Sequence, residues 1–129
     1  MATDRVKYWT EIADYDLGTA ETLYEGGRWL YVAFMCHQAI EKTLKAYWCA
    51  TQPNDPPFTH NLTTLSERTE LDKEMSDDQL DIIATLMPMN IQARYPEYKD
   101  QLAKMLTKEN CRNIIDETKK LQEWIKNKL

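Results

Sequence analysis

The chain has 129 residues, of which 43% are hydrophobic and 29% are charged, and its formal net charge is -5. A chain of this length has room for one domain, residues 1–129, built around a single core. Its composition is that of a folded globular protein and excludes a disordered or membrane-embedded class. The acidic balance excludes a general nucleic-acid coat, because non-specific binding needs many cationic contacts with phosphate.

No apolar run approaches the roughly 20 residues that span a bilayer, and the opening stretch MATDRVKYW lacks the apolar segment of a signal peptide. We therefore expect a cytoplasmic protein without a membrane partner. Cys36, Cys49 and Cys111 form no CxxC pair and are expected to be reduced core residues. The two histidines and the scattered acids show no metal-ligand spacing, so neither a metal site nor a cofactor is predicted.

Two long helices are predicted at the start of the chain. The first runs from about Asp4 to Glu25, and the Gly26-Gly27 pair ends it, since glycine readily takes the left-handed conformation that closes a helix. The second runs from about Trp29 to Thr51, and a turn this short makes the two helices antiparallel. The apolar stripe of the first helix, at spacings of three and four, consists of Trp9, Ile12, Ala13, Leu17, Ala20, Leu23 and Tyr24.

The middle of the chain is broken by prolines. Residues 52–58, QPNDPPF, are predicted to form a loop because three prolines prevent a helix. Thr59 is then the expected N-cap of a short third helix. Ser76 and Gln79 make a capping box for a fourth helix, which Pro88 kinks or ends.

The last part of the chain contains one more long helix. Pro96 disfavours a helical conformation at Tyr95, so an extended backbone is expected there. Thr107 can cap a final helix that runs to about Lys128 with one apolar face. Five helices joined by short loops predict an all-α fold, a five-helix up-and-down bundle.

The second helix carries an unusual set of polar residues beside its apolar face. Projection at 100° per residue puts His37, Glu41 and Lys45 in one lane, with Gln38 and Lys42 in the next. An exposed pair between Glu41 and Lys45 contributes only about 0.2–0.5 kcal/mol, and the alternative is that these groups meet partners from other helices. The lane lies at the boundary of burial, because it also holds Leu30, Phe34 and Trp48.

A carboxylate also interrupts the apolar stripe of the first helix, at Asp16. A buried carboxylate is costly unless a cationic group meets it. We therefore expect Asp16 to contact the second helix near His37, Lys42 or Lys45.

Four sequence elements follow one another along nearly the whole chain: A-x-x-D-L-x-x-A from Ala13, HQAIEKTLKA from His37, T-H-x-L from Thr59 and ARYP from Ala93. In this order they resemble the HEPN domain family. The resemblance implies a HEPN-like bundle of about five helices, usually dimeric and related to the helical partner of minimal nucleotidyltransferases. Such pairs commonly behave as toxin and antitoxin, and some members look like nucleotide binders.

The branch of the HEPN family that shares the HQAIEKTLKA, T-H-x-L and ARYP elements implies a nucleotide or RNA as ligand. Arg94 offers a planar fork for phosphate or carboxylate, and Tyr95 offers a face on which a base can stack. The structural alternative is that Arg94 bonds backbone carbonyls around Pro96, that Tyr95 packs in the core, and that His60 only satisfies backbone groups. The candidate ligand-binding residues are His37, Gln38, Glu41, Lys42, Lys45, His60, Arg94 and Tyr95.

Many members of the family are ribonucleases in which an arginine precedes a histidine by about four to six residues. In this chain eight residues separate Arg28 from His37, and no histidine follows Arg94. The resemblance therefore does not imply catalysis through that motif. Two alternatives to a nucleotide-associated transferase partner remain: a metal-independent ribonuclease toxin that uses His37 or His60 with Arg94, and a non-catalytic dimeric assembly module.

The first half of the second helix is apolar around nearly its whole circumference, from Trp29 to Cys36. Such a helix is either central in the bundle or covered by a second subunit. Together with the family resemblance, this pattern predicts a homodimer.

Overall fold

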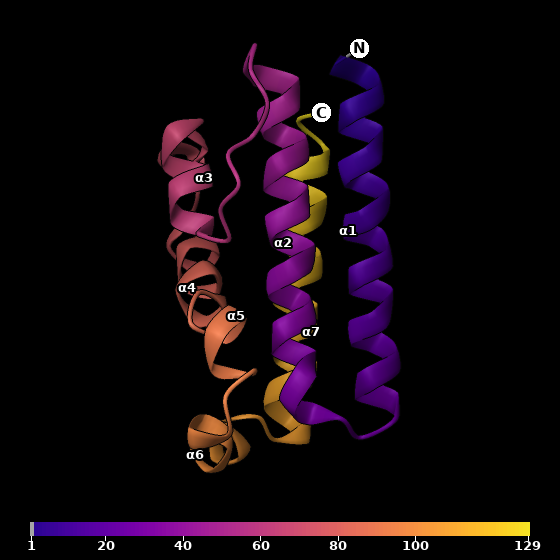
Figure 1. Cartoon of the computed structure of the whole chain (residues 1–129), viewed down its shortest axis with the longest axis vertical. Coiled ribbons are helices and arrows are strands. Elements are labelled where there is room, and N and C mark those ends of the chain that lie inside the picture. Colours follow the sequence, from indigo (N-terminus) through magenta and orange to yellow (C-terminus); the bar gives the residue numbers. More distant parts are fainter. Residues whose placement is uncertain (1) are drawn as a thin grey trace.

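Three long helices form the frame of the molecule (Figure 1): α1 (Ala2–Glu25), α2 (Trp29–Thr51) and α7 (Lys108–Lys126). The computed structural model describes residues 2–129, and Met1 lies outside them. In that part of the chain every regular element is a helix, so the predicted all-α class is confirmed. None of these helices is both long enough and apolar enough to cross a membrane in residues 2–129.

The turn between α1 and α2 is closed by glycine, as predicted. Gly27 has a φ of 72°, in the left-handed region. The amide of Arg28 donates to the carbonyl of Leu23 at 2.8 Å, and the amide of Gly27 donates to the carbonyl of Tyr24 at 3.1 Å. This pair of bonds is a Schellman motif, and it returns α2 antiparallel to α1 (Figure 1).

The segment between α2 and α7 folds as a column of short helices. Figure 1 shows this column running back along α2 to the start of α7. In chain order, α1, α2, the column and α7 run in alternating directions, as the helices of an up-and-down bundle do. The column contains α3 (Leu62–Arg68), the 3₁₀ helix η1 (Leu71–Glu74), α4 (Asp77–Leu86), α5 (Met89–Gln92), the 3₁₀ helix η2 (Pro96–Tyr98) and α6 (Lys99–Met105).

The helix caps in the column agree with the sequence prediction at α4 and differ at α3. The hydroxyl of Ser76 accepts from the amide of Gln79 at 3.2 Å, and Gln79 accepts from the amide of Ser76 at 2.8 Å, which completes the predicted capping box. The prediction of Thr59 as the cap of α3 is wrong. Asn61 takes that place, because its side chain accepts from the amide of Thr64 at 2.9 Å.

The column also contains two helices beyond the predicted five, α5 and α6. The chain leaves α4 near Pro88, as expected, but it becomes helical again at once. These short segments are stabilised by burial against the rest of the bundle, since the side chains of Met89 and Leu102 are only 1% and 2% exposed. Packing rather than local helix propensity accounts for them.

The central element is α2, which packs against each of the other α-helices. Two explanations were possible for the apolar stretch from Trp29 to Cys36. The central position of α2 in the bundle accounts for the burial of most of these side chains. Tyr31 is the exception, at 48% exposed.

The three cysteines are free and buried, as predicted. Burial raises the pKa of Cys36 to about 12 and that of Cys111 to about 11. Neither thiol is therefore a nucleophile at neutral pH.

Candidate functional site

A single buried carboxylate organises the polar residues of α2. The side chain of Glu41 is 1% exposed, and both of its oxygens meet nitrogen atoms. Oε1 lies 2.9 Å from Nδ1 of His60. Oε2 lies 3.1 Å from Nζ of Lys45 and 3.3 Å from Nζ of Lys42. We define the Glu41 network as Glu41 with its neighbours His37, Gln38, Lys42, Lys45 and His60.

Five members of the network come from α2 at helical spacing, whereas His60 comes from the segment that leads into α3. The preceding loop is held against the bundle at two points. The indole of Trp48 donates to the carbonyl of Asn54 at 3.0 Å, and Arg5 of α1 forms an ion pair with Asp55. These contacts fix the course of the loop, so that the chain returns over α2 and places His60 on Glu41.

Glu41 is ionised in spite of its burial. Burial acts to raise its pKa. The charge of Lys42, the hydrogen bond with His60 and the charge of Lys45 together outweigh that effect and lower the pKa below its usual value. At neutral pH the network therefore holds one carboxylate against two ammonium groups.

His37 lies inside the bundle beside the same carboxylate. Its side chain is fully buried, with Nδ1 4.0 Å from Oε1 of Glu41 and 3.4 Å from Nε2 of Gln38. Burial lowers its pKa to about 4, against the attraction of Glu41, so the imidazole is neutral at pH 7. Its Nε2 has no hydrogen-bond partner within the described residues. His37 supports the network from inside and is out of reach of a ligand at the surface.

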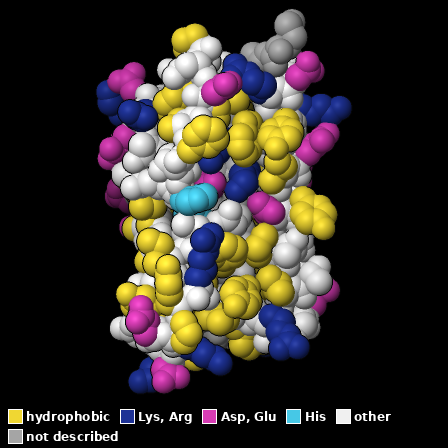
Figure 2. All heavy atoms as spheres, in the orientation of Figure 1, with side chains coloured by type: hydrophobic (Ala, Val, Ile, Leu, Met, Phe, Trp, Pro, Cys, Tyr) yellow, Lys and Arg dark blue, Asp and Glu magenta, His cyan; other side chains and the backbone are white. Residues whose placement is uncertain are grey.

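His60 and Lys42 connect the network with solvent, since their side chains are 59% and 17% exposed. Because an oxygen of Glu41 accepts at Nδ1 of His60, the neutral ring carries its hydrogen there and Nε2 is a free acceptor. Figure 2 shows a histidine at the surface of this face, with basic side chains close to it and hydrophobic side chains above and below. Lys45 is enclosed, and its Nζ lies 5.2 Å from the ring centre of Trp9.

A series of hydrogen bonds extends the network to Arg94. Nζ of Lys42 donates to Oε1 of Gln38 at 3.0 Å, and Nε2 of Gln38 donates to Oδ1 of Asn90 at 3.0 Å. Nη2 of Arg94 donates to the same Asn90 oxygen at 3.4 Å. The guanidinium of Arg94 also lies 5.2 Å from the ring centre of Phe34. Candidate residues from α2, from position 60 and from position 94 thus share one polar surface.

Three partners in this surface were not predicted from the sequence: Asn90, Trp9 and Phe34. Asn90 is 8% exposed, and a lone amide within the otherwise apolar run MPMNI is the signal that could have identified it. Trp9 and Phe34 appear in the sequence only as apolar positions of helical stripes. Their ring faces receive Lys45 and Arg94, a role that helical spacing does not reveal.

Tyr95 lies apart from the Glu41 network. Its backbone is extended, with φ -113° and ψ 127°, as predicted for a residue before proline. Its ring is 51% exposed, so Tyr95 is not the core residue that the structural alternative requires. Arg94 likewise bonds the side chain of Asn90, and no bond from Arg94 to a backbone carbonyl is present in residues 2–129.

Asp16 faces the network without a close ion pair. Burial raises its pKa, the charge of Lys42 opposes this rise, and the charge of Glu41 adds to it. The charges of Lys42 and Glu41 both act on Asp16, so its carboxylate lies within electrostatic range of the polar residues of α2. In the described part of the chain, however, its carboxylate forms no salt bridge with Lys42, Lys45 or His37.

The nitrogen atoms of the network and of Arg94 belong to lysine, arginine and imidazole groups, which suit an anion or a proton transfer. Across residues 2–129 no three histidine, cysteine or acidic side chains gather closely enough to hold a metal ion.

Comparison with known proteins agrees with the sequence resemblance. The solved structure of TT1696 from Thermus thermophilus is similar, with a TM-score of 0.81 and 22% identity over 97% of this chain and 98% of that chain. At this identity the likeness concerns the fold. No curated protein matches the sequence. A family model described as the HEPN domain matches residues 6–128. Because this match extends over nearly the whole chain, the protein belongs to the HEPN domain family.

Proposed function

We propose that this HEPN domain is the dimeric helical partner of a minimal nucleotidyltransferase, in a toxin–antitoxin pair, and that its polar surface binds a nucleotide or RNA. The observation that carries the ligand proposal is the hydrogen-bonded surface that joins His60, Lys42 and Arg94. Lys42 and Arg94 present nitrogen donors of the kind that phosphate recognition uses, whereas Nε2 of the neutral His60 ring is an acceptor. The transferase partner and the toxin–antitoxin role rest on the family resemblance.

The spacing of these groups favours a ligand with more than one phosphate. Arg94 lies over Phe34, and His60 is bound to Glu41, seven positions farther along α2. At about 1.5 Å per residue, the two sites are about 10 Å apart along the helix. A nucleoside polyphosphate or an RNA chain is long enough to extend along both positions.

The ligand proposal is tested by isothermal calorimetry and thermal shift with nucleoside mono-, di- and triphosphates and with a short RNA. A bound ligand raises the melting temperature in proportion to the logarithm of its concentration. We expect Lys42→Met and Arg94→Gln to reduce this response. Arg68→Gln, an exposed arginine on α3 outside the network, should retain it.

The transferase part has a separate test. The neighbouring genes are searched for a nucleotidyltransferase, which is then co-expressed with this protein and analysed by size-exclusion chromatography. Co-elution supports the pairing. A response to no nucleotide and no RNA, together with co-elution, would identify the protein as a pure assembly module.

The bond between His60 and Glu41 favours a second candidate, the metal-independent ribonuclease. A carboxylate that holds Nδ1–H of a histidine leaves Nε2 placed as a general base. In RNA cleavage this nitrogen would take the proton of the 2′-hydroxyl as that oxygen attacks phosphorus. The bond between phosphorus and the 5′-oxygen would break, and the departing 5′-oxygen would take a proton from solvent water. Lys42 is the cation beside His60, whereas Arg94 of the same subunit lies about 10 Å along α2.

Incubation of the purified protein with mixed RNA in the presence of a chelator tests this candidate. Cleavage should be lost in His60→Ala and retained in Arg68→Gln. Cleavage that is equal in His60→Ala and the wild type would show a contaminating nuclease and remove the candidate. His37→Ala is a poor probe, because His37 is fully buried and its loss disturbs the core.

The outer face of α1 supports the homodimer. Tyr8 and Tyr15 are 59% and 78% exposed and lie seven residues apart, which places them on one side of the helix. At Gly18, on the same side, an added Cβ would meet nothing within 4 Å, so the surface is open to a close approach. Exposed aromatic residues on a single face are typical of an interface.

Multi-angle light scattering checks the homodimer. We expect a dimeric mass for the wild type and a monomeric mass for Tyr15→Glu. Phe58→Ser, which removes another fully exposed aromatic ring, should leave the dimer intact. A monomeric wild type at high concentration would contradict the proposal.

A further inference from the structure

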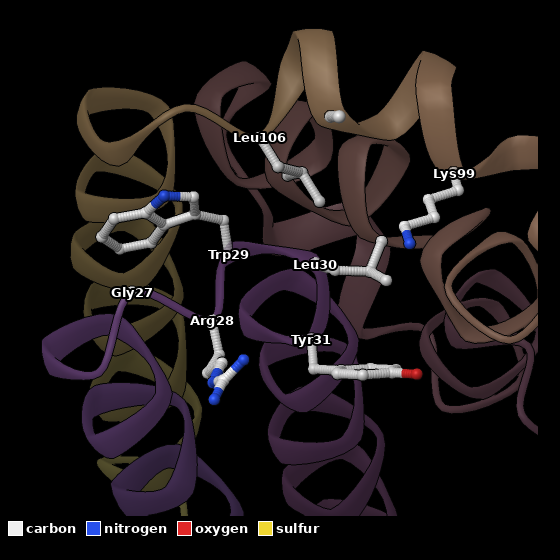
Figure 3. Close-up of a pocket in the computed structure, with 8 residues that line it drawn as sticks. Gly27, Arg28, Trp29, Leu30, Tyr31, Lys99 and Leu106 are labelled. Carbon is white, nitrogen blue, oxygen red and sulfur yellow. The ribbon is translucent and has the colours of Figure 1, made fainter.

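A groove near Arg94 combines aromatic rings with unpaired cations. It consists of two neighbouring hollows, of about 330 Å³ and about 220 Å³. The first lies between the α1–α2 turn and α6 (Figure 3), and the second lies between α2 and the turn at residues 93–96. Leu30, Tyr31 and Lys99 line both hollows, so the two adjoin. We call this surface the Tyr31 groove.

The first hollow has an apolar floor and a cationic rim. Trp29, Leu30 and Leu106 line it, and Leu106 is only 2% exposed. Figure 3 shows Lys99 extending from α6 toward Leu30, with the ring of Tyr31 beyond Leu30 and Arg28 at the turn between α1 and α2. The hollow can therefore take an apolar ring while its edge meets a negative charge.

The charges of the Tyr31 groove are all of one sign. Arg28, Arg94 and Lys99 line it, and neither hollow is lined by an aspartate or a glutamate. Most lysines and arginines of the chain form salt bridges, but in residues 2–129 these three do not. In a chain with a net charge of -5, such a concentration of free cations favours an anionic ligand.

Three aromatic residues line the groove: Trp29, Tyr31 and Tyr95. Tyr31 and Tyr95 are 48% and 51% exposed, so both rings offer surface to a ligand. Tyr31 borders both hollows, Trp29 lines the first and Tyr95 lines the second. Aromatic platforms with cations between them are the arrangement that binds single-stranded nucleic acid, because bases stack on the rings while phosphates meet the cations.

We propose that the Tyr31 groove binds single-stranded RNA, with one base in each hollow, the linking phosphate on Lys99, and the flanking phosphates on Arg28 and Arg94. The hollow volumes lie at or below the lower end of the roughly 300–1,000 Å³ of pockets for drug-sized ligands, which suits single bases better than a bulky cofactor. The inference rests on the proposed function for its ligand class. Of the candidate residues above, it uses only Arg94 and Tyr95.

Arg94 connects the groove with the Glu41 network. It lines the second hollow and reaches Lys42 through Asn90 and Gln38. A strand seated in the groove and leaving it past Arg94 runs toward His60, about 10 Å farther along α2. The groove thus supplies the binding surface, and the network receives the adjoining part of the strand.

Fluorescence anisotropy with a labelled, short single-stranded RNA tests this inference. Lys99→Glu should weaken binding about tenfold or more, because repulsion replaces a phosphate contact. Tyr31→Ala should weaken binding at least about fivefold, the lower end of the effect of one base stack. Lys104→Glu is the matched control: it makes the same charge change on α6, at an exposed position outside both hollows, and should change binding less than about twofold.

A second substitution at Tyr31 separates binding from folding. Tyr31→Phe keeps the aromatic face and should bind RNA like the wild type, while circular dichroism reports whether Tyr31→Ala is folded. If Tyr31→Phe loses binding as fully as Tyr31→Ala, stacking at this position is not the cause and the inference fails.

Three further outcomes are decisive. If RNA binding is lost in Lys42→Met but unchanged in Lys99→Glu and Tyr31→Ala, the groove inference fails and the proposed function stands. If the wild type binds neither RNA nor any nucleotide, both fail. If the groove variants weaken binding of an acidic peptide or of duplex RNA but not of single-stranded RNA, the groove has another ligand and the inference is overturned.

Discussion

The hydrogen bond of 2.9 Å between Nδ1 of His60 and Oε1 of Glu41 joins an imidazole that is 59% exposed to a carboxylate that is 1% exposed. The carboxylate stands on the central helix, and the imidazole stands on the segment that leads into α3. The bond therefore fixes that segment on the core and orients Nε2 of His60 at the same time. Glu41 links the stability of the bundle to the geometry of its polar surface.

Replacement of Glu41 should cost considerable stability. Glu41→Ala leaves the ammonium of Lys45, whose side chain is 8% exposed, buried without a counter-charge. Removal of one partner of a buried pair costs about 3–5 kcal/mol, and Glu41→Gln should cost less because it keeps hydrogen-bonding groups. Urea unfolding at pH 7, followed by circular dichroism, measures the loss. Glu67→Ala, at an exposed glutamate of α3, should stay within about 0.5 kcal/mol of the wild type.

Stability should fall as the pH drops from 6.5 toward 4, through His37. In the unfolded chain its imidazole takes up a proton near the ordinary pKa of 6.5, whereas in the folded protein burial lowers that pKa to about 4. The unfolded state therefore binds more protons in this window, so the free energy of unfolding decreases with decreasing pH. At about 1.4 kcal/mol per pKa unit the loss is on the order of 3 kcal/mol.

The free energy of unfolding of His37→Gln, measured across the same pH range, checks this assignment. The variant should show a flatter profile than the wild type between pH 6.5 and 4, whatever its stability at pH 7. Equal slopes in the two proteins would assign the pH dependence to other groups.

The long helices were predictable because their signals are local. The Gly26-Gly27 pair forms the Schellman motif that ends α1, and Thr107 accepts from the amide of Asn110 at 3.1 Å to begin α7. The additional helices α5 and α6 have four and seven residues and lie close to prolines. Segments of this length are not stable alone, so their existence depends on contacts with α2 that no local pattern records.

The polar lane of α2 was recognised from the sequence, but its degree of burial was not. Projection put His37, Glu41 and Lys45 at the boundary of burial, and the structure buries all three. The cover comes partly from His60, which is 19 residues from Glu41 in the sequence. A projection of one helix contains no information on what lies over it, and for the same reason Asn90 was missed as the partner of Gln38.

Replacement of Arg112 by lysine should lower the stability of the fold. Its Nη1 and Nη2 each lie 3.1 Å from an oxygen of Glu21 on α1, and its guanidinium lies 4.8 Å from the ring centre of Tyr24. The hydrogen bond from Arg112 is the largest cause that lowers the pKa of Glu21, to about 2. Lysine can neither form the fork nor stack on the ring. We expect Arg112→Lys to lose about 1 kcal/mol, since both partners are partly exposed.

Urea unfolding at pH 7 measures that loss, and an acid series tests its cause. The ionised Glu21 carboxylate contributes stability above pH 4.5, and this contribution is lost as the pH falls toward 2. The free energy of unfolding of Arg112→Lys should therefore decrease less than that of the wild type between pH 4.5 and 2. Lys120→Arg, at an exposed pair with Glu117, should stay within about 0.5 kcal/mol of the wild type. A loss in Arg112→Lys no larger than in that control would contradict the role of the fork.

Two neighbouring aspartates of α1 should respond to the same substitution with opposite signs. Asp14 binds Lys126 at 2.9 Å and Gln122 at 2.7 Å, so Asp14→Asn should lower the melting temperature and reduce the free energy of unfolding by up to about 1 kcal/mol.

Asp16 should respond in the opposite way, because burial raises its pKa above the ordinary value of 3.8. The folded state therefore binds more protons at Asp16 than the unfolded state, and stability is lost as the pH rises through the folded-state pKa. Asp16→Asn removes this cost and should raise the melting temperature at pH 7 but not at pH 3. Differential scanning calorimetry of both variants decides the matter: a decrease at pH 7 in Asp16→Asn as large as that in Asp14→Asn would mean that Asp16 forms a close pair with Lys42 in solution.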